Sequence, residues 1–187
     1  PYCIGFFSGN ELPWSDPVTY AGNLLREKKS PARSTLTDAL KRKFGKIEQL
    51  NTVLDTAFDS WRELEENPVK ALPDLTPIEA ECRNFYRTAL EHYFRPIRDM
   101  IRRYAPGKLY LGVRFMHYPD ITLGEVAADF CDVVSMNRYS YDESEMRIPG
   151  RDVPILVTEF HFGALDRGMF HPGLRWGGDQ QDVAWCY

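Results

Sequence analysis

The sequence predicts an α/β fold, arranged either as an open doubly wound sheet or as part of a closed eight-stranded (β/α)8 TIM barrel. Four short runs are mostly apolar with little alternation, which is typical of parallel strands covered on both faces. Helical patterns lie between these runs, and strands that alternate with helices indicate parallel connections. The dinucleotide-binding and phosphate-loop glycine motifs that would support an open sheet are absent from the sequence.

The predicted strands are residues 2–8, 109–115, 132–136 and 154–160. Between the first two we expect two or three helices, more than a minimal crossover requires, and therefore a helical insertion over about residues 15–106. One amphipathic helix is predicted over residues 47–64, where apolar side chains recur on one face. Another short helix is expected over residues 123–130, followed by a polar loop over residues 140–152. We treat residues 1–187 as one partial barrel domain.

A long helix is predicted to begin at Thr76. Thr76 is a capping residue, Pro77 suits the first helical position, and Glu79 lies three residues after the cap. Pro96 is expected to kink or break this helix before it ends near Tyr104, because proline lacks the amide proton that the helical ladder needs.

The composition excludes several classes of function. The net charge of −4 argues against a surface for nucleic acid or anionic lipid, and no apolar run approaches the roughly 20 residues of a membrane span. The four cysteines are far apart in the sequence and lack the close spacing of zinc or redox motifs, so we expect free, buried thiols. The expected partner is neutral or small, and no cofactor is implied.

Polar residues cluster where the predicted strands end. Catalytic residues of a barrel lie at the carboxyl ends of its strands, so these positions test the barrel interpretation. The candidates are Asn10 and Glu11 after the first strand, Arg114 and His117 at the second, Asn137 and Tyr139 after the third, and Glu159 and His161 at the fourth.

Glu11 and Glu159 are the two carboxylates that a retaining glycosidase requires. Parallel strands would bring them to the same rim, where one protonates the leaving oxygen and the other attacks the anomeric carbon, with carboxyl groups roughly 5–5.5 Å apart. Tyr139 and Arg114 are candidate hydrogen-bond donors that keep Glu159 ionised. Asn10 is a candidate for binding a sugar hydroxyl beside the reacting carbon.

The same residues carry a resemblance to a known family. GFFSGNELPW resembles the fourth-strand motif of the retaining barrel glycosidases, DVVSMNRYSY their sixth strand, and PILVTEFHFGALDRG their seventh. Together with KLYLGVRF, these blocks are most similar to glycoside hydrolase family 50, the β-agarases, and more distantly to the family 42 β-galactosidases. The similarity is weakest over residues 15–77, and Gly9 stands where the family is expected to have Asp.

This resemblance implies a function and a set of site residues. It implies a retaining hydrolase of β-linked galactose polysaccharides, agarose first, with Glu11 as acid/base and Glu159 as nucleophile. Five further residues would line the subsite where the bond breaks: Asn10, Arg114, Asn137, Tyr139 and His161. A secreted or periplasmic location follows from the resemblance alone, and the implied partner is an oligo- or polysaccharide.

Aromatic and histidine side chains allow more than one interpretation. Trp14 and Trp176 follow strand ends and would suit stacking on sugar rings, whereas Trp61 is expected in the helical core. His161 alternates with Glu159 as a metal pair would, but no third ligand has a matching position, so we expect no metal site.

The length leaves the barrel incomplete. The chain supplies what resembles strands four to seven, and four strands cannot close a barrel of about 250 residues. A further segment of the same polypeptide, or a second copy in a homodimer, would have to cover the open sheet. The alternatives to an agarase are a β-galactosidase of the same clan, a non-catalytic truncated barrel that binds saccharide or serves in assembly, and an unrelated open-sheet protein.

Overall fold

The computed structural model describes residues 2–117, 120–142, 146–166, 168 and 170–186. The chain divides into two compact units. The first consists of Pro1–Pro13 with Phe94–Tyr187 and contains the sheet, so we call it the sheet unit. The second, Trp14–Tyr93, is built from helices and is called the helical unit.

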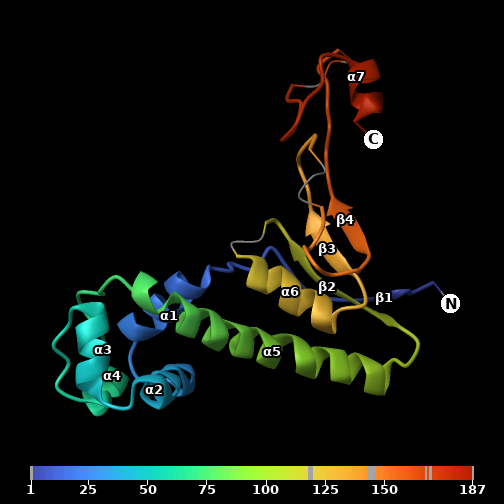
Figure 1. Cartoon of the computed structure of the whole chain (residues 1–187). Helices are drawn as coiled ribbons and strands as arrows, with labels where there is room; N and C mark the ends of the chain where they lie inside the picture. The colour runs from blue at the N-terminus through green and yellow to red at the C-terminus, as the bar shows by residue number, and fades with distance from the viewer. Residues whose placement is uncertain (1, 118–119, 143–145, 167, 169, 187) are drawn as a thin grey trace. The chain divides into compact units, whose positions relative to one another are not determined.

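The sheet unit is organised around four parallel strands in the order β1-β2-β3-β4 (Figure 1). Their bounds are Gly5–Asn10 for β1, Leu109–Phe115 for β2, Val134–Asn137 for β3 and Ile155–Glu159 for β4. Helix α6 (Ile121–Phe130) connects β2 to β3, and α7 (Gln180–Trp185) follows β4. Because neighbouring strands run parallel, all four carboxyl ends lie at the same edge of the sheet.

The core of the sheet unit lies around β2, β3 and α6. Each fully buried apolar side chain there contributes about 1.5–3 kcal/mol to folding. Its main members are Tyr110, Leu111, Val113, Phe115, Leu123, Val126, Ala127, Val134 and Met136. By contrast, Phe6 and Phe7 of β1 are each 43% exposed and Leu156 of β4 is 36% exposed. Within the described residues, the two outer strands each pair on one side only.

The helical unit contains α1 (Pro17–Arg26), α2 (Pro31–Phe44), α3 (Ile47–Leu54), α4 (Trp61–Glu66) and the 3₁₀ helix η1 (Thr76–Ile78). Helix α5 (Glu79–Tyr104) begins in this unit and ends in the sheet unit. Sequence signals fix the start of α2, because Ser30 accepts a hydrogen bond from the Arg33 amide and proline fills the first helical position. The helices surround an apolar core that includes Leu24, Leu36, Leu40, Leu50, Leu64 and Ile78.

A buried arginine joins helix ends inside this unit. Arg33 is fully buried, and its guanidinium donates to the backbone carbonyls of Leu64, Glu27 and Asn67. Glu27 and Asn67 are the C-caps of α1 and α4, where carbonyls lack helical partners and carry partial negative charge. Burial lowers the pKa of Arg33, and the carbonyls compensate the charge.

The prediction of one helix over residues 47–64 is wrong. Helix α3 ends at Leu54 because Asp55 adopts a left-handed conformation with φ of 51° and ψ of 54°. The Asn51 side chain stabilises the turn by bonding the Phe58 backbone, and Ser60 then caps α4. Local hydrogen bonds between side chain and backbone therefore end the helix, although the apolar spacing continues beyond it.

The number of helices was also underestimated. Five α-helices and one 3₁₀ helix separate β1 from β2, where two or three helices were expected. Thr76 and Pro77 open the 3₁₀ turn, and α5 starts at Glu79. Pro96 does not break α5, which continues from Glu79 to Tyr104. Phe94 beside it is completely buried and packs on Tyr110, with ring centroids 6.4 Å apart.

The strands are close to their predicted positions. The second matches residues 109–115, whereas the first runs over Gly5–Asn10 instead of residues 2–8. Tyr2 is 97% exposed and lies outside the register with β2. The third and fourth are shifted or shortened by one or two residues, and the predicted helix over 123–130 starts two residues earlier. Across the described residues, no helix is both long and apolar enough to traverse a lipid bilayer.

Candidate active site

Four of the predicted site residues lie at the carboxyl edge of the sheet, one from each strand. Asn10 ends β1, Asn137 ends β3 and Glu159 ends β4, while Arg114 is the last but one residue of β2. The register pairs Asn10 with Arg114 and Asn137 with Glu159. Side-chain hydrogen bonds from Asn137 to Asn10 and from Arg114 to Glu159 link the two pairs. The parallel topology thus assembles residues from distant parts of the sequence.

Glu159 is held by two donors. Nη2 of Arg114 lies 2.6 Å from Oε1, and the Tyr139 hydroxyl lies 2.9 Å from Oε2. The same Arg114 nitrogen also donates to the Thr158 carbonyl at 3.1 Å, and its guanidinium lies 5.9 Å from the centre of the Phe7 ring. Both donors that the sequence assigned to Glu159 contact it. A hydrogen bond between an arginine and a carboxylate is charge-assisted, and such bonds are shorter and stronger than those between neutral groups.

The pKa of Tyr139 is raised, chiefly because its hydroxyl donates to Glu159. Burial and the negative charge of Glu159 add to this increase, and Arg114 opposes it. The charge of Glu11 also contributes, which means that the two carboxylates act on the same phenol. Tyr139 therefore remains a protonated donor at neutral pH.

Glu11 follows β1 directly in an unusual backbone conformation. Its φ is 48°, a region that non-glycine residues rarely adopt and that costs of order 1–3 kcal/mol. The Glu11 amide donates to the Arg114 carbonyl at 2.9 Å, which fixes this conformation against β2. Its carboxylate is exposed, and Oε1 accepts a hydrogen bond of 2.9 Å from Nδ2 of Asn137.

Asn137 connects the strand ends. It is only 1% exposed, and its Nδ2 donates to Oδ1 of Asn10 at 3.1 Å as well as to Glu11. Its Oδ1 accepts from the Thr158 hydroxyl at 2.8 Å. The side chain therefore has a partner for both ends of its amide, which fixes its orientation toward Glu11.

The remaining predicted site residues take other positions. His161 is exposed, and its ring lies against the Gly163 and Gly173 backbones, where a side chain at position 173 would clash with the imidazole. Trp176 is 67% exposed, and its carbonyl accepts a hydrogen bond from the Tyr141 hydroxyl.

The structure also places one further histidine and two tryptophans that the sequence singled out. His117 is exposed in the loop after β2. Trp14 lies in the helical unit and packs edge to face on Tyr93, with ring centroids 5.4 Å apart. Trp61 packs against the helical core, as expected, and its indole nitrogen donates to the Gly45 carbonyl at 3.0 Å.

Sequence reasoning missed Thr158, which precedes Glu159. Its hydroxyl bonds Asn137 and its carbonyl bonds Arg114, so it contacts a partner of each glutamate. The available signal was a hydroxyl residue on the strand next to the candidate nucleophile, but its orientation depends on an irregular strand register.

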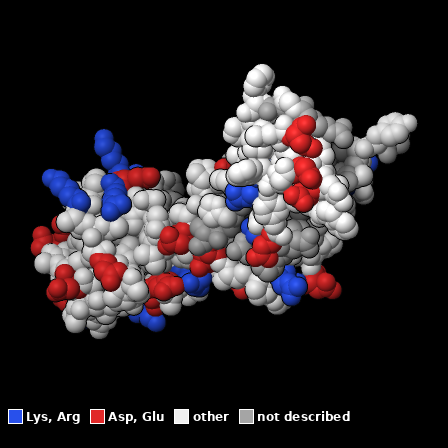
Figure 2. Space-filling view, turned by 90° about the horizontal axis from the view of Figure 1, so that it is seen from above, with Lys and Arg blue, Asp and Glu red and all other residues white. Residues whose placement is uncertain are grey.

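All four cysteines are free, as predicted, although only Cys82 and Cys131 are buried. Burial raises the pKa of Cys82 to about 11 and that of Cys131 to about 12. In the part of the chain that the structure describes, no three His, Cys, Asp or Glu side chains gather in a way that would hold a metal ion. Acidic and basic side chains occur on both units in the view of Figure 2.

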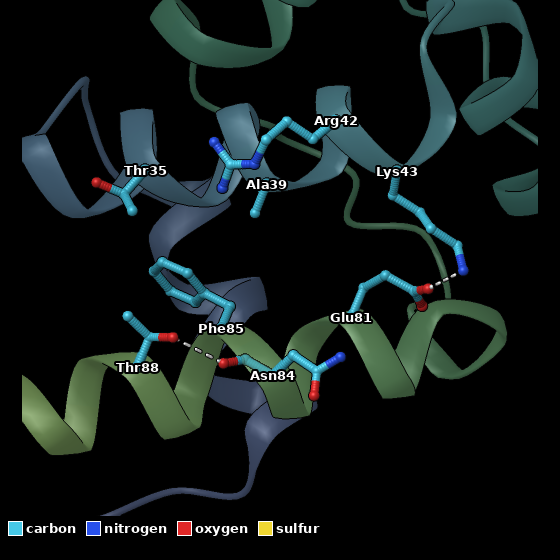
Figure 3. A pocket seen from close by; sticks show the side chains of 8 residues that line it. All are labelled: Thr35, Ala39, Arg42, Lys43, Glu81, Asn84, Phe85 and Thr88. Atoms are coloured by element: carbon cyan, nitrogen blue, oxygen red, sulfur yellow. Dashed lines mark hydrogen bonds and ion pairs between the residues drawn. The ribbon is translucent and has the colours of Figure 1, made fainter.

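The helical unit contains a separate open cavity of about 430 Å³ between α2 and α5 (Figure 3). Phe85 projects from α5 toward α2, and Lys43 pairs with Glu81 at 3.1 Å at one end. No predicted site residue lines this cavity. The candidate active site is therefore the carboxyl edge of the sheet, where polar side chains from four strands meet.

The chain resembles known proteins in both sequence and structure. No profile of a known protein family matches the chain. Over its whole length the chain is 33% identical to Beta-agarase B of Vibrio sp. (strain JT0107), of which it covers 21%. It also matches the crystal structure of the agarase AgWH50C, with a TM-score of 0.88, 30% identity and full coverage of the chain but 28% of that structure.

A second solved structure, described as an exo-beta-agarase, gives a TM-score of 0.86 at 31% identity, again over the whole chain and 27% of the structure. The chain thus spans between 21% and 28% of the length of these relatives. Sequence and fold together confirm the resemblance of this chain to the β-agarases of glycoside hydrolase family 50.

Proposed function

We propose that the protein is a retaining glycoside hydrolase that cleaves β-linked galactose polysaccharides, agarose first. In this proposal Glu159 is the nucleophile and Glu11 is the general acid/base. The observation that carries it is the contrast between two glutamates at one sheet edge, of which Glu159 is bound by a cation and a phenol and Glu11 by an amide. The names of the similar proteins support the substrate class.

The surroundings of Glu159 suit a nucleophile. A carboxylate that attacks carbon must be ionised, and Arg114 and Tyr139 both donate to it in that form. Its side chain keeps 32% exposure, so a sugar ring can reach it.

The surroundings of Glu11 suit proton exchange. An acid/base must be neutral before the first step and charged after it. Glu11 accepts a hydrogen bond from the neutral side-chain amide of Asn137, whereas Glu159 accepts one from a cation. Because Glu11 is exposed, we expect the bound sugar and any covering segment to complete its environment.

The proposed reaction has two steps. In the first, a Glu159 oxygen bonds to the anomeric carbon, the glycosidic bond breaks, and the departing oxygen takes the Glu11 proton. In the second, Glu11 removes a proton from water, the water oxygen bonds to the anomeric carbon, and the bond to Glu159 breaks. Both inversions together retain the anomeric configuration, and the chemistry needs only the two carboxylates and water.

We further propose that the sheet is part of a (β/α)8 barrel. Four sequential parallel strands with functional residues at their carboxyl ends support this arrangement. The partly exposed Phe6, Phe7 and Leu156 side chains on the outer strands support coverage by another segment of a longer polypeptide or by a second copy.

The function is tested by hydrolysis of agaro-oligosaccharides with the wild type and the Glu11→Gln and Glu159→Gln variants. Each variant is expected to lose nearly all activity while remaining folded, because the amide can neither exchange the proton nor attack carbon. Proton NMR of the first product should show the β anomer. An α anomer as the first product would contradict the retaining mechanism.

Glu48→Gln provides a control, because Glu48 is an exposed carboxylate in the first turn of α3 in the helical unit. It should hydrolyse the substrate at the wild-type rate. Saccharide binding without cleavage by the wild type would instead favour a non-catalytic binding module. Faster cleavage of a simple β-galactoside than of agaro-oligosaccharides would favour a β-galactosidase.

A further inference from the structure

Thr158 occupies an irregular position at the end of β4. Met136 pairs with Val157 and Asn137 pairs with Glu159, so Thr158 has no partner in the register between β3 and β4. An extra residue of this kind is a β-bulge, which redirects side chains and occurs often beside active sites. The bulge allows both Thr158 and Glu159 to reach groups at the sheet edge.

The Thr158 hydroxyl fixes the amide that contacts Glu11. It lies 2.8 Å from Oδ1 of Asn137 and 3.2 Å from the Met136 carbonyl. On its other side, Asn137 faces two oxygens, from Asn10 and Glu11, and can satisfy both only with its Nδ2 group. Because Asn137 is buried, loss of the Thr158 donor would leave Oδ1 without a partner.

The Thr158 backbone contributes to the second glutamate. Its carbonyl accepts a hydrogen bond of 3.1 Å from the same Arg114 nitrogen that donates to Glu159. The guanidinium is therefore anchored beside the carboxylate that it binds. Thr158 thus contacts the donor of each glutamate. Its side chain bonds Asn137, the donor to Glu11, and its backbone carbonyl bonds Arg114, the donor to Glu159.

We infer that Thr158 is a positioning residue that holds Asn137 against Glu11 and Arg114 against Glu159. The first role belongs to the hydroxyl and the second to the backbone of the bulge, so substitution of the side chain should affect the Glu11 half. The inference about catalysis rests on the function proposed above, whereas the effect on the Asn137 amide does not.

The test compares Thr158→Val, which keeps the shape and removes the hydroxyl, with Thr158→Ser, which keeps the hydroxyl. The matched control is Thr37→Val, because Thr37 is a buried threonine whose hydroxyl has no hydrogen-bond partner among the residues that the structure describes. Circular dichroism checks that each variant is folded.

The first readout is the side-chain amide of Asn137 in nitrogen-15 NMR. Thr158→Val is expected to speed its hydrogen exchange by about ten-fold or more, because Oδ1 of Asn137 loses its donor and the Nδ2 group is then less firmly held on Asn10 and Glu11. Thr158→Ser should remain within about two-fold of the wild type, and Thr37→Val should leave this signal unchanged. An unchanged Asn137 amide in Thr158→Val would overturn the inference.

The second readout is hydrolysis of aryl β-galactosides with good and poor leaving groups. Misplacement of the acid should lower kcat/KM of Thr158→Val by about ten-fold for the poor leaving group and much less for the good one, since only the poor one needs the proton. Equal losses for both substrates, or failure of Thr158→Ser to restore the rate, would overturn the positioning role.

The two proposals fail in different ways. If Glu11→Gln hydrolyses both substrates normally, the proposed acid/base role fails, while the Asn137 signal still decides whether Thr158 holds the amide. If Glu11→Gln is inactive but Thr158→Val is normal in both readouts, the positioning inference alone is wrong.

Discussion

Replacement of Arg114 by methionine should reduce catalysis by removing the cation from Glu159. Arg114→Met loses the 2.6 Å bond to Oε1 and the 3.1 Å bond to the Thr158 carbonyl, while methionine retains much of the apolar contact with the Phe7 ring. Hydrogen bonds to charged groups contribute about 1.5–3 kcal/mol. The Arg114 and Glu159 side chains are 26% and 32% exposed, so the lower half of that range applies.

A loss of about 1.5–2 kcal/mol corresponds to a decrease of roughly 10- to 30-fold in kcat/KM. The assay is the initial rate of agaro-oligosaccharide hydrolysis at neutral pH, with thermal unfolding measured on the same preparations. Arg151→Met is the control in the same unit, because it removes a comparable ion pair of 2.9 Å with Asp129, away from the site residues. A folded Arg114→Met variant with activity within two-fold of the wild type would refute the reasoning.

Three further predictions concern stability and titration. Arg33→Met should lower the free energy of unfolding by about 3–5 kcal/mol, because buried carbonyls lose charged donors. Urea unfolding measures this loss, and Arg42→Met, which removes an exposed arginine, is the control. The pKa of Tyr139 is higher in the folded protein than its ordinary value of 10.0, so the hydrogen bond of the protonated phenol stabilises the fold below pH 10. This stabilisation is lost as the pH rises through the pKa of the folded state. Tyr139→Phe should therefore show a smaller loss of stability above pH 10 than the wild type, and identical pH profiles would contradict this. Alkylation by iodoacetamide at pH 8, read by mass spectrometry, should modify the exposed Cys3 and spare Cys131, whose pKa burial raises to about 12; equal labelling would show that the thiol is accessible.

The sheet edge could be predicted because parallel topology constrains it strongly. Once the apolar runs are identified as parallel strands, the residues that follow them must meet at one edge, whatever their separation in sequence. Glu159 with its donors Arg114 and Tyr139 is the clearest example. The contact between Asn137 and Glu11 follows from the same constraint.

The helical unit was harder to predict because local interactions compete with periodicity. Apolar residues continue at helical spacing through residues 47–64, but Asp55 turns the chain and Asn51 bonds the following loop. A stripe of apolar residues records which side chains are buried and does not require one continuous helix. Conversely, α5 continues through Pro96, where the sequence predicted a kink or a break.

Thr158 was missed for a different physical reason. Regular alternation would place adjacent strand residues on opposite faces, so a threonine beside the candidate nucleophile is expected to point away from it. The bulge changes that geometry, and a bulge depends on the pairing of two strands.

The central claim is that Glu159 attacks the anomeric carbon, and covalent trapping tests it most directly. Incubation with an activated 2-deoxy-2-fluoro-β-galactoside, followed by peptide mass spectrometry, should locate one added fluorogalactosyl group on Glu159, because the fluorine slows release of the intermediate. No adduct should form in Glu159→Gln. A protein that hydrolyses the non-fluorinated substrate but carries the label on another residue would contradict the account.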